Sequence, residues 1–169
     1  MQSTTVQPAE KTQVAGVIPP AALIEHWQGH RKLTRKMIEA FPEDKLFNYS
    51  VGGMRPFADL ALEMINMAGP GVEGARTGKW TNWSEDKFNI NTKAELLKKW
   101  DEVTAIIDKS APQISLERYH EKDLAFGQWE GPVYWIILYW IDNEIHHRGQ
   151  GYVYLRSLGI QPPAFYDRF

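Results

Sequence analysis

Apolar residues recur at helical spacing along most of the chain, and prolines and glycines separate the periodic segments. A first helix is predicted after Pro19-Pro20, ending at Phe41-Pro42, because proline is tolerated at a helix start and disfavours helix in the residue before it. A second helix is predicted to follow Arg55-Pro56 and to end before Gly69-Pro70-Gly71.

Two further helices have clear boundary signals. Thr92 to Glu95 has the sequence of a capping box, in which the threonine and glutamate side chains each bind the other's backbone amide. This predicts a third helix that ends at Ala111-Pro112. A fourth helix is predicted from Gly131-Pro132 to Leu158, with Gly159 as its left-handed cap.

The connections between these segments suggest the topology. The linker between the second and third helices, residues 69 to 91, exceeds about twenty residues, which allows the two helices to be parallel. We therefore predict an all-α fold, a four-helix bundle with a long crossover between its second and third helices. Residues 113–129 are ambiguous and could hold a short extra helix. Residues 1–18 are expected to form a flexible arm before one helical domain, residues 19–169.

Composition narrows the choice of partners. The net charge is −2, and charged residues of both signs make up 24% of the chain. The basic cluster formed by Arg31, Lys32, Arg35 and Lys36 is typical of the solvated face of a helix, so no nucleic-acid partner is expected. The chain has no cysteine, which excludes disulfides, thiolate nucleophiles and cysteine-ligated zinc.

The chain shows no targeting or membrane signal. Residues 1–18 are polar and lack the charged start and apolar block of a signal peptide. The most apolar run, Val133 to Ile141, is far shorter than the ~20 residues that span a bilayer. We therefore expect a cytoplasmic protein that makes no membrane contact.

Candidate chemistry follows that apolar run, in the segment Asp142 to Gln150, which contains His146-His147. Asn143 and His147 are four residues apart and so share one face of the predicted helix. This spacing suits a metal site, although the first position holds an amide instead of an imidazole. His30 falls on the inward face of the first helix.

The C-terminal part of the chain resembles the DinB/YfiT-like superfamily. The resemblance rests on His146 to Gln150, Tyr154-Leu155-Arg156 and Leu158 to Pro163, and the helix order extends it over nearly the whole chain. It implies a crossover four-helix bundle, often dimeric, with a divalent metal held by three histidines. Members with known activity use the metal to activate a small thiol for transfer or isomerisation.

Matched position by position, the family's three histidines fall on Glu63, Asn143 and His147, so only one histidine is retained. A carboxylate remains a good ligand, but an amide oxygen is a poor one for zinc or nickel. The resemblance thus implies a metal site of Glu63, Asn143 and His147, with His30 as a possible extra ligand. Zn, Ni, Mn and Fe are the candidate ions.

The residues leave several alternatives open. Glu63 borders apolar positions, so it requires a neutralising partner: a metal, His147, His30 or an arginine. Three functions are compatible with this: a metal-dependent enzyme acting on a small molecule, a binding protein without activity, or a metal-free enzyme with Glu63 and His147 as catalytic acid–base pair.

The fourth helix also suggests self-association. It is rich in aromatic residues beyond what one buried face needs, among them Tyr134, Trp135, Tyr139 and Trp140. Together with the family's tendency to dimerise, this predicts a homodimer with a contribution from the fourth or first helix.

Overall fold

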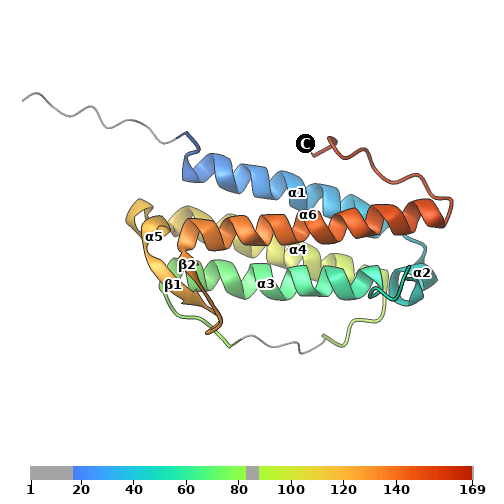
Figure 1. Cartoon of the computed structure of the whole chain (residues 1–169), viewed down its shortest axis with the longest axis horizontal. Helices are drawn as coiled ribbons and strands as arrows, with labels where there is room; N and C mark the ends of the chain where they lie inside the picture. Colours follow the sequence, from blue (N-terminus) through green and yellow to red (C-terminus); the bar gives the residue numbers. More distant parts are fainter. Residues whose placement is uncertain (1–16, 83–87, 169) are drawn as a thin grey trace, which may run out of the picture.

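The computed structural model describes residues 17–82 and 88–168, which form a helical bundle with one small hairpin (Figure 1). The elements are α1 (Pro20–Ala40), α2 (Glu43–Asn48), α3 (Phe57–Thr77), α4 (Lys93–Ser110), a 3-10 turn (Ala111–Gln113), α5 (Leu116–His120), β1 (Lys122–Ala125), β2 (Trp129–Pro132) and α6 (Val133–Ser157). The predicted four-helix bundle is confirmed, with α1, α3, α4 and α6 as its long helices.

The long helices form two parallel pairs, α1 with α6 and α3 with α4, and the pairs are antiparallel to each other (Figure 1). Along α1 and α6, Trp27 packs on Trp140 and the next turns bring Arg31 to Glu144, as in parallel helices. The chain returns from the end of α3 to start α4 at the opposite end of the bundle, which confirms the predicted crossover.

Local signals set most helix ends as predicted. Thr92 Oγ1 accepts a hydrogen bond from Glu95 N, and Glu95 Oε2 accepts one from Thr92 N, which completes the capping box at the start of α4. α1 begins at Pro20 and gives way to extended backbone at Phe41. Gly159 caps α6 with φ +75°, a conformation that glycine adopts without strain.

The predicted end of the second helix was wrong. α3 does not end before Gly69-Pro70-Gly71 but continues to Thr77, with Pro70 on its exposed side. A Cβ on Gly71 would lie 2.6 Å from the Trp140 ring, and one on Gly74 would lie 2.3 Å from Trp80. These glycines let large aromatic side chains pack directly on the α3 backbone. Tertiary packing therefore overrides the weak intrinsic helix propensity of this segment.

Three short elements were not predicted in detail. α5 confirms the extra helix expected in residues 113–129, but α2 and the β1–β2 hairpin were missed. The hairpin turns at Phe126-Gly127, where both residues have positive φ, and it lacks the Asn-Gly or Asp-Gly sequence that identifies such turns. Its strands have four residues each, too few to show alternation.

The N-terminal arm falls largely outside the described residues; only Val17 and Ile18 of it are described, and both are exposed. Across the described part of the chain, none of the helices has the length and apolar character needed to cross a bilayer.

A buried carboxylate links α6 to α1 inside the bundle. Glu144 is 1% exposed, accepts a hydrogen bond from Thr34 Oγ1 (2.6 Å) and lies 3.8 Å from both Arg31 and Arg148. The Arg31 guanidinium also stacks on the Trp100 ring, 3.9 Å from its centroid. Burial raises the pKa of Glu144, and the two arginines act against that rise. The Arg148–Glu144 pair, one turn apart on α6, is thus part of a larger network.

We expect Glu144→Leu to lower the free energy of unfolding by about 3–5 kcal/mol, because it leaves Arg31 and Arg148 buried without their carboxylate. Urea denaturation followed by helical dichroism measures this change. Arg35→Ala is the matched control: it removes exposed ion pairs from α1 and should cost no more than about 1 kcal/mol. An equally small loss for Glu144→Leu would mean that hydroxyl and carbonyl groups alone satisfy the arginines.

Candidate functional site

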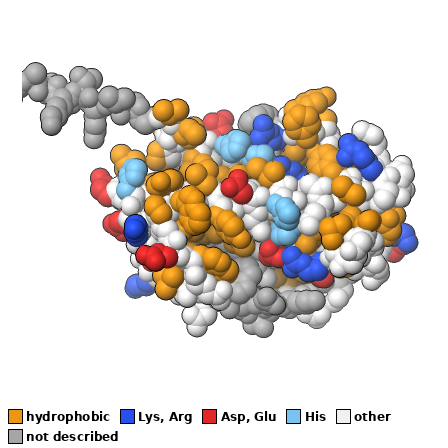
Figure 2. Space-filling model, in the orientation of Figure 1, with side chains coloured by type: hydrophobic (Ala, Val, Ile, Leu, Met, Phe, Trp, Pro, Cys, Tyr) orange, Lys and Arg blue, Asp and Glu red, His pale blue; other side chains and the backbone are white. Residues whose placement is uncertain are grey.

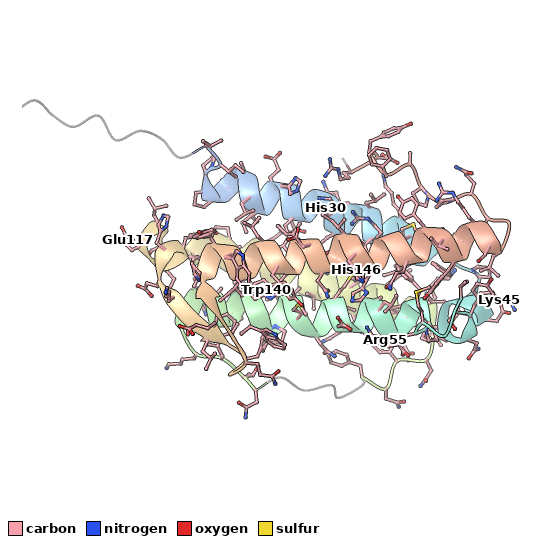
Figure 3. The ribbon with its side chains drawn as sticks, in the orientation of Figure 1. His30, Lys45, Arg55, Glu117, Trp140 and His146 are labelled. Atoms are coloured by element: carbon pink, nitrogen blue, oxygen red, sulfur yellow. The ribbon has the colours of Figure 1, made fainter. Side chains whose placement is uncertain are left out.

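Glu63, Asn143 and His147 meet at the boundary between α3 and α6. Glu63 lies in the first third of α3, and the other two lie one turn apart on α6. Residues four apart share one face of a helix, so Asn143 and His147 both reach the Glu63 carboxylate from α6. Figure 3 shows Arg55 and His146 along this boundary, with Trp140 further toward the hairpin.

Both oxygens of the Glu63 carboxylate are engaged. Oε1 accepts hydrogen bonds from His147 Nε2 (2.9 Å) and Asn143 Nδ2 (3.1 Å). Oε2 accepts a hydrogen bond from Arg55 Nη2. The convergence of Glu63 and His147 that the sequence predicted is confirmed by this geometry. Of the four partners considered for Glu63, the structure supplies two, His147 and an arginine.

Sequence reasoning missed two residues of the site, Arg55 and Gln150. Arg55 precedes the Pro56 that begins α3, and its side chain reaches two turns along the helix to Glu63. Gln150 Oε1 lies 2.9 Å from His147 Nδ1. Gln150 was detectable as the i+3 neighbour of His147 on one helix face. Arg55 had no comparable signal, because it lies outside the helix.

The contacts keep the carboxylate ionised. Hydrogen bonds to the carboxylate lower the pKa of Glu63 to about 2, although burial of the carboxyl acts in the opposite direction. The hydrogen bond from His147 contributes most, and those from Arg55 and Asn143 add to it. A carboxylate with so low a pKa is a weak general base near neutral pH. As an ionised group it accepts hydrogen bonds from charged and neutral N–H donors.

The donor set does not fit the three-histidine metal centre implied by the family. Zinc and nickel need free lone pairs, but Nε2 of His147 donates to Glu63 and Arg55 holds the other carboxylate oxygen. In the described ranges, no three His, Cys, Asp or Glu side chains lie together as a metal would require. One observation points the other way: Asn143 Oδ1 is buried without a hydrogen-bond partner.

His30 joins a different part of the bundle. Its Nδ1 lies 2.8 Å from Arg148 Nη2, and its Nε2 lies 3.0 Å from Arg168 Nη1. Burial, with Arg148, His26 and Arg168 nearby, lowers the pKa of His30 to about 3, so the imidazole is neutral. The structure therefore places His30 with these arginines on the α1 side of α6, and places Glu63 on the α3 side. His146 and His26 are exposed.

We expect Glu63→Gln to destabilise the protein in a pH-dependent way. The pKa of Glu63 is about 2 in the folded protein against 4.5 ordinarily, so its stabilising effect is complete above about pH 5 and disappears as pH falls toward 2. After allowance for partial solvent screening, wild type should exceed the variant by about 2 kcal/mol at pH 6 and by less than half of that at pH 3.

Denaturant titrations of both proteins at pH 6, 4.5 and 3 measure the difference. Asp142→Asn is a suitable control, because Asp142 is an exposed carboxylate on α6. A wild-type advantage that stays constant over this range would contradict the low pKa of Glu63.

Comparisons with known proteins agree with this fold. No curated protein matches the chain. A crystal structure of a DinB-like protein from Bacillus cereus ATCC 10987 superposes with a TM-score of 0.67 at 19% sequence identity, covering 86% of this chain and 97% of that one. A DinB-like protein from Bacillus subtilis gives the same TM-score at 17% identity, covering 87% of this chain and 99% of that one. The model of the DinB family matches residues 9–169, and the chain therefore belongs to the DinB family.

Proposed function

We propose that this protein is a small-molecule-binding member of the DinB family, in which an ion pair occupies the place of the metal. The observation that supports this most directly is the Arg55–Glu63 pair, supplemented by the hydrogen bonds from His147 and Asn143. A guanidinium supplies positive charge and N–H donors to the carboxylate, which is the role a cation would otherwise fill. The site then recognises ligands through hydrogen bonds at the α3–α6 boundary.

A metal-dependent enzyme is the second candidate, and the unpaired Asn143 Oδ1 favours it. A divalent ion bound to Glu63, Asn143 and His147 would give this oxygen a partner. It would also have to displace Arg55, whose side chain is 52% exposed, and remove the hydrogen from His147 Nε2. The metal-free acid–base enzyme has less support, because the pKa of Glu63 is about 2 and both nitrogens of His147 face polar partners.

Metal titration separates the first two candidates. We expect full-length wild type, purified without a metal-affinity column, to bind Zn²⁺ or Ni²⁺ with a dissociation constant no tighter than about 0.1 mM by calorimetry. The double variant Glu63→His with Asn143→His restores three imidazoles at these positions. It should bind the same ions at least about 100-fold more tightly, because imidazole nitrogen suits both metals.

The variant with His147→Ala added is the control, and it should lose the gain. Micromolar binding by wild type that His147→Ala abolishes would overturn the proposal and support the metal-dependent enzyme. A melting temperature that falls on chelation of the wild type would support the same conclusion.

We also propose that the protein forms a homodimer through the exposed face of α6. Ile145 and Val153 are 40% and 53% exposed, and Gly149 lies between them, one turn from each. A Cβ on Gly149 would meet nothing within 4 Å, so no contact with the described residues of this chain accounts for a glycine here. Glycine in a helix interior costs up to about 1 kcal/mol, and close approach of a second helix would offset that cost.

Gly149→Ala tests this interface. If two α6 helices cross there, the added methyl groups should weaken dimerisation at least about tenfold, as measured by sedimentation equilibrium or light scattering over a concentration series. Ser157→Ala, at an exposed position near the end of α6, is the control. A wild type that stays monomeric at high micromolar concentration contradicts the dimer. In that case Gly149→Ala should only stabilise the helix.

A further inference from the structure

The polar site continues into an apolar cavity one helical turn away. On α3, Met67 follows Glu63 by four residues; on α6, Tyr139 precedes Asn143 by four. Because the helices are antiparallel, these steps lead in the same direction, about 6 Å along the bundle. Met67 and Tyr139 both line the cavity, so the two features occupy neighbouring stretches of one α3–α6 groove.

The cavity is small, apolar and partly open. Its volume is about 50 Å³, and its walls include Met67, Phe126, Trp129, Trp135, Tyr139 and Trp140. Trp135 and Tyr139 are 50% and 44% exposed, so its rim reaches solvent. Figure 2 shows hydrophobic side chains gathered over this end of α6 and, toward the middle of the face, histidine with acidic and basic side chains. The volume is about one third of the ~150 Å³ that holds a benzene ring, so only the branched end of a short alkyl chain fits inside, and the rest of the chain lies along the open rim.

Its inner wall is held in place by the hairpin turn. Phe126 has φ +54°, a conformation that a residue with a side chain adopts only at a cost in free energy. Its ring packs on Trp80 from the crossover, and Trp80 packs on Trp140. The hairpin therefore closes the end of the groove with a fixed aromatic wall.

The polar end of the groove calls for a ligand that donates hydrogen bonds and carries positive charge. Glu63 is ionised, Asn143 Oδ1 is buried and unpaired, and Asp59 lies one turn before Glu63 on α3. The guanidinium of Arg55 already occupies Glu63 Oε2, as a cationic N–H donor from the protein itself. Half of the Arg55 side chain is exposed, so it can move into solvent, and the charge of a bound ammonium then replaces the guanidinium charge that Glu63 loses.

We propose that the groove binds a small primary amine with a branched aliphatic tail of about five carbons, with the ammonium on Glu63 and Asn143 and the branched end of the tail in the aromatic cavity. Such a chain spans the helical turn that separates the two features. The ammonium group takes the place of the Arg55 guanidinium, and its N–H groups supply a partner to Asn143 Oδ1. This inference rests on the proposed binding function and names its ligand class.

Nuclear magnetic resonance titration of the full chain with 3-methylbutylamine at pH 7 tests the inference. An amine is protonated at this pH, and six heavy atoms allow a dissociation constant on the order of 1 mM. The indole N–H signals of Trp135 and Trp140 should shift on binding. The isosteric alcohol 3-methylbutan-1-ol should bind at least about fivefold more weakly, since it lacks the charge that pairs with Glu63.

Two variants give opposite responses. Glu63→Gln should weaken amine binding at least about fivefold, whereas Arg55→Ala should tighten it about threefold or more, because it removes the competing cation. Arg35→Ala, which removes an exposed arginine paired with Asp101 on the far side of the bundle, should leave binding unchanged. A merely structural role for Arg55 would not produce a gain.

Equal binding of the amine and the alcohol, or weaker amine binding by Arg55→Ala, would overturn the inference. So would the absence of indole shifts at about ten times the expected dissociation constant. These outcomes leave the proposed metal-independent site standing. Tight metal binding by wild type, in the calorimetric test above, would overturn both.

Discussion

A carboxylate that is buried between helices must be matched by positive charge, and two such carboxylates govern how α6 sits in this bundle. Glu144 faces α1 and lies between Arg31 and Arg148, and Glu63 faces α6 from α3 and lies between His147 and Arg55. An uncompensated charge in either place would cost several kcal/mol. The register of α6 against both neighbours is therefore tied to these pairs.

The two networks differ in the access that solvent has to them. Glu144 is fully enclosed, and its contacts can serve only the fold. Glu63 is about one fifth exposed and one of its partners is a half-exposed arginine, so a ligand can reach it by displacing that side chain. The functional proposal therefore concerns the side of α6 that faces α3, and not the side that faces α1.

Small residues decide where large side chains can enter. Gly71 and Gly74 open the surface of α3 to Trp140 and Trp80, and Gly151 opens α6 to the Phe57 ring. These contacts hold α3 as one helix through Pro70. They also bring the aromatic side chains to the end of the groove, where the hairpin turn at Phe126 completes the cavity.

The sequence was sufficient for the long helices, because each has either a periodic apolar face or a local stop signal such as the Thr92 capping box. It also indicated that Glu63 needs a partner, with His147 among the candidates, since a carboxylate at an apolar edge requires a neutralising group. It could not choose among the four possible partners of Glu63, because Arg55 reaches the site from a loop whose course depends on tertiary packing. The extension of α3 beyond Pro70 and the hairpin were missed for the same reason: neighbouring aromatic rings stabilise them, not local propensity.

The central claim is that Glu63 is an ionised carboxylate held by Arg55, His147 and Asn143. A carbon-13 titration of the Glu63 side-chain carboxyl by nuclear magnetic resonance tests it most directly, with assignment by the loss of that signal in Glu63→Gln. With a pKa of about 2, the signal should keep the chemical shift of a carboxylate from pH 7 down to pH 3, and addition of Zn²⁺ at pH 7 should leave it unmoved. Protonation with a midpoint near the ordinary value of 4.5, or a large shift on addition of Zn²⁺, would contradict the account.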